Sequence, residues 1–403
     1  MSPAEDWESA APRRRRVLPI VAMVAVAMVG GVALGGTTQP DDLAPTGELR
    51  VTEVPAPPAA EPVPPLDTQI DGRWTNMAPS PIAGRVGAAV AWTGRHVMFW
   101  SGVGTEGFTD GALYDPLRNV WRPLGRGPLS PRFGAAAVWD DDEVVVAGGV
   151  AVTAGGAARR PVRRLRDAAA YNSETDSWRR LPALPFPVTA GRLFARQGTL
   201  FAVRSTASRR PITTLDVGSS AWRLQPSVQW AASGDETAAA REGNTLLVWP
   251  QGRGDLMAFD VMTRRWTRVP HDPAGEMDTC TCTLVPGANA NGGVDIVAYD
   301  DDTPRWWRRQ LGPNQPSFAG GTDNHLFLVY SPARTQALGR RTGRVRSVPL
   351  ETQTLAYQPA AVWTGTRLVL WGGVSGVRMR FTSDGLVFAP WARRAATGRF
   401  VRL

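Results

Sequence analysis

A pair of bulky residues seven positions apart recurs along this chain and constrains its fold more than any other feature. In the clearest copies a tyrosine or phenylalanine precedes a tryptophan. These copies are Tyr114 with Trp121, Tyr171 with Trp178, Phe259 with Trp266, and Tyr299 with Trp306. Leu215 with Trp222 keeps the spacing, and Leu338 with Val345 resembles a decayed copy. The tryptophans recur every 40 to 57 residues, which indicates an internal structural repeat.

Two further strand-like segments precede the bulky pair in the clearest repeats. The first is rich in Gly and Ala and ends in Trp, and the second is β-branched and ends in a glycine pair or a related turn. This arrangement occupies residues 89–102, 136–149 and 361–373. Short alternating runs separated by turn residues predict hairpins. Four strands in each unit of about 40–50 residues are typical of propeller blades, so we expect an all-β propeller.

The repeat predicts seven four-stranded blades. Their inner strands are expected near residues 85–92, 131–139, 189–196, 235–241, 279–285, 318–323 and 357–363. Six blades follow instead if the unit from Cys280 to Trp307 is defective. Trp74 lies in an outer strand without a blade of its own. The N-terminal strand is therefore expected to complete the last blade, beside Arg399–Leu403.

The glycine pair, the Tyr-to-Trp spacing and an Arg near the start of the inner strand together resemble the kelch repeat. The resemblance covers about residues 72–403. It weakens in the middle of the chain, where Val203-Arg204 and Trp249-Pro250 replace the glycine pair. It implies a propeller like the central domain of galactose oxidase.

The copper site of galactose oxidase is not expected here. That site uses tyrosines, histidines and a cysteine cross-linked to one of the tyrosines. In this chain His96, His271 and His325 lie in separate units, and no Tyr-Cys arrangement recurs. We expect no metal and no other cofactor.

The N-terminal region has the pattern of a membrane anchor followed by a spacer. Four arginines, Arg13 to Arg16, precede an uncharged apolar run over residues 17–36. About 20 such residues cross a bilayer as a helix, and flanking positive charge stays in the cytoplasm. Residues 1–16 are therefore expected inside the cell. Residues 37–70 are rich in Pro and lack the apolar residues for a core, so they predict a disordered linker before a folded domain at 71–403.

A cleaved signal peptide is the alternative interpretation of the same segment. The small residues Ala33 and Gly35 are suitable for a signal peptidase. The protein would then be secreted rather than anchored. Both interpretations place the propeller outside the cytoplasm.

All 45 basic residues are Arg, because the sequence contains no Lys. Chemistry that needs a lysine amine is therefore excluded. Residues 71–403 hold 40 Arg and 27 acidic residues, a net charge of +13. Such a domain favours anionic partners. Nucleic acid fits this charge but not an extracytoplasmic location, so it is not expected as a partner.

Arginines near the start of inner strands are the main candidates for ligand binding. Arg85, Arg132 and Arg192 precede the inner strands of three successive blades and are expected to meet at one mouth of the central channel. The insertion 150–166 should lie on the same face. Five arginines form the predicted ligand set: Arg85, Arg132, Arg192, Arg159 and Arg163. Guanidinium groups pair well with carboxylate or phosphate. The structural alternative is that an Arg at this position ties neighbouring blades together.

Further arginines lie in that insertion and in loops elsewhere. Those expected on the same face are Arg160, Arg164, Arg166, Arg209, Arg210, Arg378 and Arg380. Those expected on the opposite face are Arg264, Arg265, Arg340 and Arg341.

Carboxylates near inner-strand starts raise a second functional class, a carbohydrate-active enzyme. Asp235, Glu236 and Asp278 are the suspects, because glycoside hydrolysis needs two carboxylates about 5–10 Å apart. The acidic runs at 140–143 and 300–302 are interpreted as solvated hairpin turns, since neither has the spacing of an EF-hand calcium loop.

Cys280 and Cys282 form the only cysteine pair. Residues two apart on a strand share one face. A strained disulfide, two free thiols and soft-metal binding all stay open.

These observations predict a membrane-tethered, extracytoplasmic propeller that binds a protein or an anionic polymer of the cell envelope. An enzyme is not the expected class, since no catalytic constellation is evident. The alternatives are the carbohydrate-active enzyme and a purely structural, degenerate propeller.

Overall fold

The structure, a computed structural model, describes much of the chain from residue 72 to residue 402. The described residues are 72–152, 163–204, 206, 208–216, 218–228, 237–250, 255–270, 283–288, 294–300, 305–309, 318–321, 325–331, 334–339, 345–348, 356–375, 380–393 and 400–402. Within them, no helix is long and apolar enough to cross a bilayer. The basic N-terminus (1–16), the expected anchor (17–36) and the spacer (37–70) lie outside this part of the chain and stay predictions.

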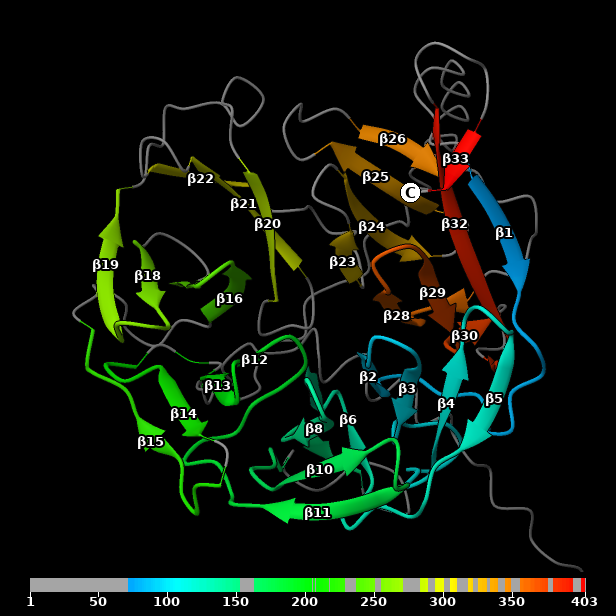
Figure 1. Cartoon of the computed structure of the whole chain (residues 1–403), viewed down its shortest axis with the longest axis horizontal. Coiled ribbons are helices and arrows are strands. Elements are labelled where there is room, and N and C mark those ends of the chain that lie inside the picture. Colours follow the sequence, from blue (N-terminus) through cyan, green and yellow to red (C-terminus); the bar gives the residue numbers. More distant parts are fainter. Residues whose placement is uncertain are drawn as a thin grey trace, which may run out of the picture.

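In the described part of the chain, the strands form six four-stranded antiparallel blades that follow one another around a ring in sequence order (Figure 1). Blade 1 consists of β2 (Ala89–Trp92), β3 (Val97–Trp100), β4 (Gly111–Asp115) and β5 (Val120–Pro123). Blade 2 consists of β7 (Ala136–Asp140), β8 (Glu143–Ala147), β10 (Ala168–Asn172) and β11 (Ser177–Leu181). Blade 3 consists of β12 (Leu193–Arg196), β13 (Thr199–Val203), β14 (Ile212–Asp216) and β15 (Arg223–Leu224).

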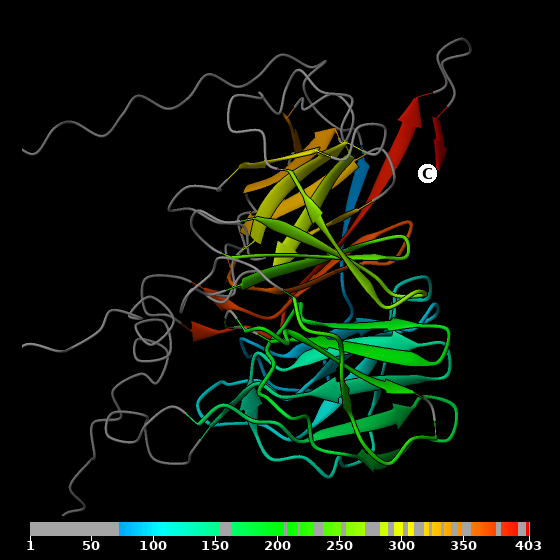
Figure 2. The ribbon, with the colours of Figure 1, turned by 90° about the vertical axis from the view of Figure 1, so that its left-hand side faces the viewer.

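The second half of the ring is built in the same way. Blade 4 consists of β16 (Thr237–Glu242), β17 (Thr245–Pro250), β18 (Leu256–Asp260) and β19 (Arg265–Val269). Blade 5 consists of β23 (Phe318–Gly321), β24 (His325–Ser331), β25 (Arg334–Gly339) and β26 (Val345–Val348). Blade 6 consists of β28 (Ala360–Trp363), β29 (Leu368–Trp371), β32 (Gly385–Arg393) and β1 (Gly72–Asn76). In a side view, the green sheets of blades 2 and 3 lie below the yellow and orange sheets (Figure 2).

The expectation of seven blades is not supported, and the six-blade alternative describes the ring. The segment in question forms three strands, β20 (Thr283–Ala288), β21 (Val294–Asp300) and β22 (Arg305–Arg309). They extend the sheet of blade 4 edge to edge, because β20 pairs with β16 through Ala288 and Ala239. Tyr299 still pairs with Trp306 in this segment. The seven-residue spacing therefore reports a hairpin, and a hairpin alone does not make a separate blade.

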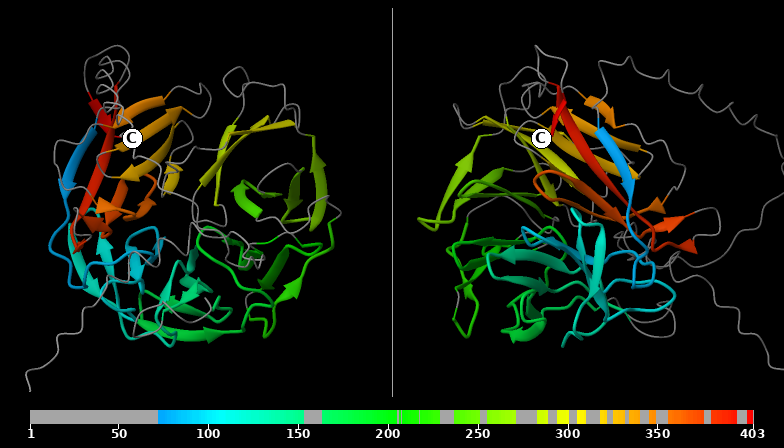
Figure 3. Two further views of the ribbon diagram at one scale, coloured as in Figure 1. Left: turned by 180° about the vertical axis from the view of Figure 1, so that it is seen from behind. Right: turned by 45° about the vertical axis from the view of Figure 1, so that its right-hand side comes forward.

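The N-terminal strand completes the last blade, as expected from Trp74, but its neighbour is β32 rather than the C-terminal residues beside which it was expected. Strand β1 pairs antiparallel with β32 from Gly72 opposite Pro390 to Asn76 opposite Leu386. The rings of Trp74 and Phe388 lie 4.9 Å apart. The C-terminal strand β33 (Phe400–Arg402) pairs with the far end of β32. The view from behind shows the blue β1 against the red β32 (Figure 3). One sheet therefore holds both ends of the described chain and closes the ring.

The Tyr-to-Trp spacing is the register of the two outer strands. Tyr114 lies opposite Trp121 and Tyr171 lies opposite Trp178, with ring centroids 4.8 and 5.0 Å apart. The indole N–H of four outer tryptophans also donates to a carbonyl in the segment that leads from the previous blade. These bonds join Trp121 to Ala78 (2.9 Å), Trp178 to Gly125 (3.0 Å), Trp222 to Pro182 (2.8 Å) and Trp266 to Pro226 (3.0 Å). The tryptophans thus fill the wide outer gap and fix the spacing between blades.

The apolar core lies between neighbouring blades rather than in one central layer. Between blades 2 and 3 it contains Ala147, Phe186 and Leu200, and between blades 6 and 1 it contains Phe99 and Trp371. Neighbouring blades therefore bury apolar faces against each other, and blade 4 packs in the same way against Val297 of β21 and Trp306 of β22.

The glycine pairs at the ends of second strands adopt a backbone that other residues rarely take. Gly148 and Gly149 have φ of 66° and 87°, and Gly372 and Gly373 have φ of 74° and 99°. A Cβ at Gly148 would overlap the carbonyl oxygen of Val188, in the segment that enters the next blade. The pair therefore permits a close approach of two blades.

Replacing Gly148 by Ala should destabilise the protein more than replacing Gly94 by Ala. Both glycines have positive φ, but a Cβ at Gly94 meets no atom within 4 Å. Gly94→Ala should cost about 1 kcal/mol from backbone strain alone. Gly148→Ala should cost at least about 2 kcal/mol, because the Val188 backbone must also move. Equal losses in chemical denaturation would contradict the close approach.

Candidate functional site

The end of the propeller where second strands finish and inner strands begin is called here the loop face. It holds four arginines of the predicted ligand set, Arg85, Arg132, Arg192 and Arg163. Because neighbouring strands are antiparallel, the segment before each inner strand lies beside the loop between the second and third strands. Hydrogen bonds between Val86 and Val103, both at 2.9 Å, show this adjacency in blade 1.

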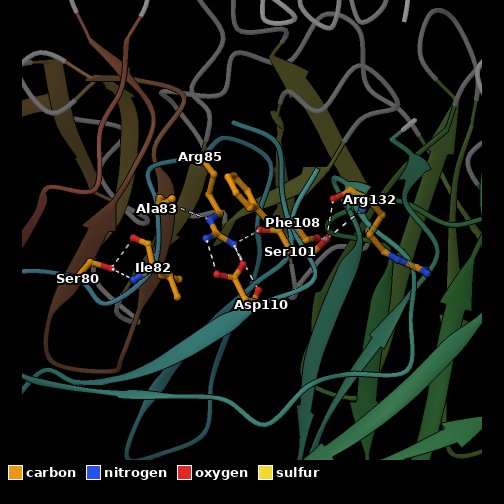
Figure 4. A network of polar contacts seen from close by, with 8 residues as sticks. All are labelled: Ser80, Ile82, Ala83, Arg85, Ser101, Phe108, Asp110 and Arg132. Carbon is orange, nitrogen blue, oxygen red and sulfur yellow. Dashed lines mark hydrogen bonds and ion pairs between the residues drawn. The ribbon is translucent and has the colours of Figure 1, made fainter. Parts of the chain in front are cut away.

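Arg85 is buried at the junction of blades 6 and 1, with a side chain that is 0% exposed. Its Nη1 donates to Oδ1 of Asp110 at 2.7 Å and to the Ser101 carbonyl at 3.2 Å (Figure 4). Its Nη2 donates to Oδ2 of Asp110 at 3.3 Å, and its Nε to the Ala83 carbonyl at 2.8 Å. The guanidinium also lies 4.1 Å from the centre of the Phe108 ring.

Arg132 repeats this arrangement one blade further on. Nη1 and Nη2 each donate to one carboxylate oxygen of Asp167 at 2.9 Å. Nη1 also reaches the Gly148 carbonyl at 2.9 Å, while Nε and Nη2 reach the carbonyl and hydroxyl of Ser130 at 2.9 and 3.3 Å. A guanidinium has five N–H donors. All five of Arg132 therefore have acceptors within the protein.

Each of these two arginines joins consecutive blades. The Arg85 carbonyl accepts from Gly373 N–H of blade 6 at 2.9 Å, while its side chain binds blade 1. The Arg132 carbonyl accepts from Gly102 N–H of blade 1 at 3.0 Å, while its side chain binds blade 2. Ser101 adds a second link, because its Oγ accepts from Arg132 N–H at 3.0 Å. These contacts support the structural alternative for Arg85 and Arg132, and a ligand role for them stays untested.

Arg192 occupies a different place from the other two. Arg85 and Arg132 precede a positive-φ glycine by two residues, whereas Arg192 follows such a glycine, Gly191. Its side chain points forward to blade 4, where Nη1 donates to Oγ1 of Thr237 at 3.3 Å. Arg192 is buried as well, so it links blades 3 and 4 by another route. Its role in ligand binding is likewise untested.

The acids that hold these arginines were not predicted from the sequence. Asp110 and Asp167 each stand directly before a third strand, and their side chains are 52% and 38% exposed. Burial raises the pKa of the Asp167 carboxyl, but the hydrogen bonds and charge of Arg132 outweigh it, so this pKa lies below its usual value. The sequence feature that could have indicated Asp167 is its position immediately before the strand that carries Tyr171.

Replacing Arg132 by Met should destabilise the protein by about 3 kcal/mol, because Ser130, Gly148 and Asp167 would lose their donors. Arg95→Met is the matched control, since Arg95 is exposed in a hairpin on the opposite face. That control should change the free energy of unfolding by less than about 0.5 kcal/mol. Urea denaturation followed by Trp fluorescence measures both. A loss for Arg132→Met no larger than for the control would contradict a blade-linking role.

The Asp167 carboxylate should contribute stability above the pKa of an unfolded Asp, about 3.9. Its folded pKa is lowered, so this contribution disappears as the pH falls through the folded value. The Tm difference between wild type and Asp167→Asn should therefore be largest from about pH 5 upward and vanish toward pH 2. A difference that grows on acidification would show that the carboxylate is not the group responsible.

Five other arginines on the loop face are exposed: Arg163, Arg164, Arg166, Arg209 and Arg210. They lie in the loops between the second and third strands of blades 2 and 3, and we call these two loops the basic loop pair. Within the described part of the chain, none of these arginines forms an ion pair. Arg163 belongs to the predicted ligand set, whereas Arg159 of the same loop lies outside the described residues.

The two loops of the basic loop pair flank one segment, residues 184–188, in which Leu184, Phe186 and Val188 are buried. Leu184 N–H donates to the Arg166 carbonyl at 2.8 Å. The guanidinium of Arg204, at the base of the second loop, lies 4.7 Å from the centre of the Phe186 ring. The loops are therefore neighbours. Residues 204–211 contain three arginines and no acid, whereas the equivalent loop of blade 1, residues 101–110, contains two acids and no arginine.

The remaining candidates are only partly described. Asp235, Glu236, Asp278, Cys280, Cys282 and His271 lie outside the described residues. Elsewhere in the described chain, no group of three or more His, Cys, Asp or Glu side chains is placed to hold a metal ion. The acidic turn at 140–143 contains an ion pair between Glu143 and Arg179. Burial and the adjacent acids raise the pKa of Asp140.

Comparison with known proteins adds a similar solved structure and no relative by sequence. No protein-family model matches the chain, and no curated protein matches it. The solved structure entitled "Structure of YjhT" is similar with a TM-score of 0.46 and 13% identity, over 77% of this chain and 96% of that one. The strand pairing described above defines the class independently of this similarity: the chain forms an all-β propeller with six blades in its described part.

Proposed function

We propose that this protein is a kelch-type propeller that acts as a binding module and engages an anionic partner through the basic loop pair. The partner is a protein or an anionic polymer of the cell envelope. One observation carries this proposal: five exposed arginines lie on two adjacent loops without a described carboxylate partner. A guanidinium in that condition is available to carboxylate or phosphate groups, which it binds through two parallel hydrogen bonds.

The kelch assignment is supported by three features that recur at equivalent places. These are the glycine pair with positive φ, the outer Tyr–Trp hairpin and the Arg that joins blades. We further propose that residues 17–36 anchor the propeller in the membrane, with residues 1–16 in the cytoplasm and the propeller outside. The alternative of a secreted protein follows if the segment is cleaved. The carbohydrate-active alternative depends on Asp235, Glu236 and Asp278, which lie outside the described residues.

Binding of the full-length chain, in detergent micelles, to fluorescent poly-L-glutamate and to long-chain polyphosphate tests this function. Changing all five arginines of the basic loop pair to Gln should raise the Kd at least about tenfold, since each exposed charge contributes up to about 1 kcal/mol. The wild-type Kd should also rise between about 50 and 500 mM NaCl, because salt screens exposed charges.

A double variant of the opposite face, Arg95→Gln with Arg265→Gln, is the matched control. Both residues are exposed, and neither belongs to the loop face. Its Kd should stay within about twofold of the wild type. Equal loss of binding in both variants would indicate a nonspecific charge effect. Unchanged binding of the five-Arg variant would overturn the proposed site. A pull-down from membrane and cell-wall fractions with the same variants then identifies the natural partner.

A further inference from the structure

Blade 6 keeps the acid of the blade-linking pair. The strand register shows the equivalence, because the inner-strand residues Ala89, Ala136 and Ala360 lie opposite Trp100, Ala147 and Trp371. The third strands begin opposite the same residues, at Gly111, Ala168 and Gly385. The residue directly before each third strand is Asp110, Asp167 or Asp384. Asp384 is therefore the counterpart of the two acids that each bind a guanidinium.

The arginine of the pair is missing from blade 6. In blade 2, Arg132 pairs with Ala151 in the short ladder of β6 (Arg132–Phe133) and β9 (Val150–Ala151). In blade 6, Ala356 pairs with Ser375 in the ladder of β27 (Ala356–Tyr357) and β30 (Val374–Ser375). Ala151 and Ser375 both follow the second glycine of the pair by two residues. Ala356 thus takes the place that Arg132 holds in blade 2.

A pocket of about 390 Å³ lies beside Asp384 in blade 6. Asp384, Thr382 and Gly372 line it together with Trp371, Leu370 and Met77. One carboxylate oxygen of Asp384, Oδ2, accepts from the Thr382 hydroxyl at 2.7 Å. Within the described part of the chain, Asp384 forms no ion pair. The exposed residue Asp384 therefore lines a space large enough for a side chain.

Two of the groups that bind a guanidinium elsewhere are retained in this pocket. Nη1 of Arg85 and of Arg132 donates to the carbonyl of the first residue of the glycine pair, Ser101 or Gly148, as well as to the acid. Gly372 is the corresponding residue in blade 6 and lines the pocket. The apolar walls suit the alkyl stem and the flat face of an arginine.

We propose that the Asp384 pocket binds the arginine side chain of a protein or peptide partner. A guanidinium matches the retained acceptors, because it binds a carboxylate and a carbonyl with one planar group. The site would recognise a cationic residue, whereas the basic loop pair would recognise anionic groups. The proposal therefore does not depend on the proposed function.

Isothermal titration of the full-length chain, in detergent micelles, with N-acetyl-L-argininamide tests this pocket. N-acetyl-L-citrullinamide is the neutral probe of nearly the same shape. The arginine probe should bind, and Asp384→Asn should weaken it at least about tenfold. The citrulline probe should not bind measurably. Glu106→Gln is the matched control, since Glu106 is an exposed acid in the equivalent loop of blade 1, and it should leave the affinity unchanged. Equal affinity of the wild type and Asp384→Asn would overturn the proposal.

Restoring the missing arginine gives an independent test. Ala356→Arg should supply Asp384 with a partner from within the chain, weaken binding of the arginine probe and raise the Tm by about 2 °C or more. Adding Asp384→Asn to this variant should remove the increase in Tm. A folded Ala356→Arg protein that still binds the probe like the wild type would contradict the equivalence. If this variant does not fold, the titration of Asp384→Asn decides alone.

Discussion

The propeller depends on a buried guanidinium that is fixed from two blades at once. A guanidinium out of water needs an acceptor for each N–H, and the five donors of Arg132 find theirs in Ser130, Gly148 and Asp167. The carbonyl of the same residue accepts from the preceding blade at Gly102. A rotation of one blade against the next would break both sets of bonds together. The glycine pairs follow from this constraint, because their conformation brings the second strand close to the neighbouring segment.

The periodic part of this fold could be predicted from the sequence. The seven-residue spacing became a strand register, with Tyr171 opposite Trp178, because a two-strand hairpin of fixed loop length fixes which residues meet. The incomplete blade of Trp74 correctly indicated closure by the N-terminal strand. The number of blades was predicted less well, since Tyr299 and Trp306 form a regular hairpin in a sheet that extends blade 4. Local patterns determine hairpins, whereas the packing of one sheet on another decides the number of blades.

The chemistry of the loop face was harder to predict, because the sequence does not distinguish a buried arginine side chain from an exposed one. Asp110 lies 25 residues after Arg85, but Asp167 lies 35 residues after Arg132, since the second loop is longer. No constant spacing therefore reveals the pair. The exposed arginines of the basic loop pair were predicted as a group from their loops. The absence of the blade-linking arginine from blade 6 could be recognised only from the strand register, which gives the positions of Ala356 and Asp384.

The pairing of β1 with β32 has a consequence for how the chain folds. Thr75 and Val387, which contact each other in this sheet, are 312 residues apart in sequence. Contacts between such distant residues form slowly, because a long loop must close before the contact stabilises anything. Strand β1 is also synthesised before every other described strand of the propeller, whereas its partner β32 follows only after the other blades. The ring can therefore close only after β32 has left the ribosome, and until then β1 is exposed to unwanted strand pairing.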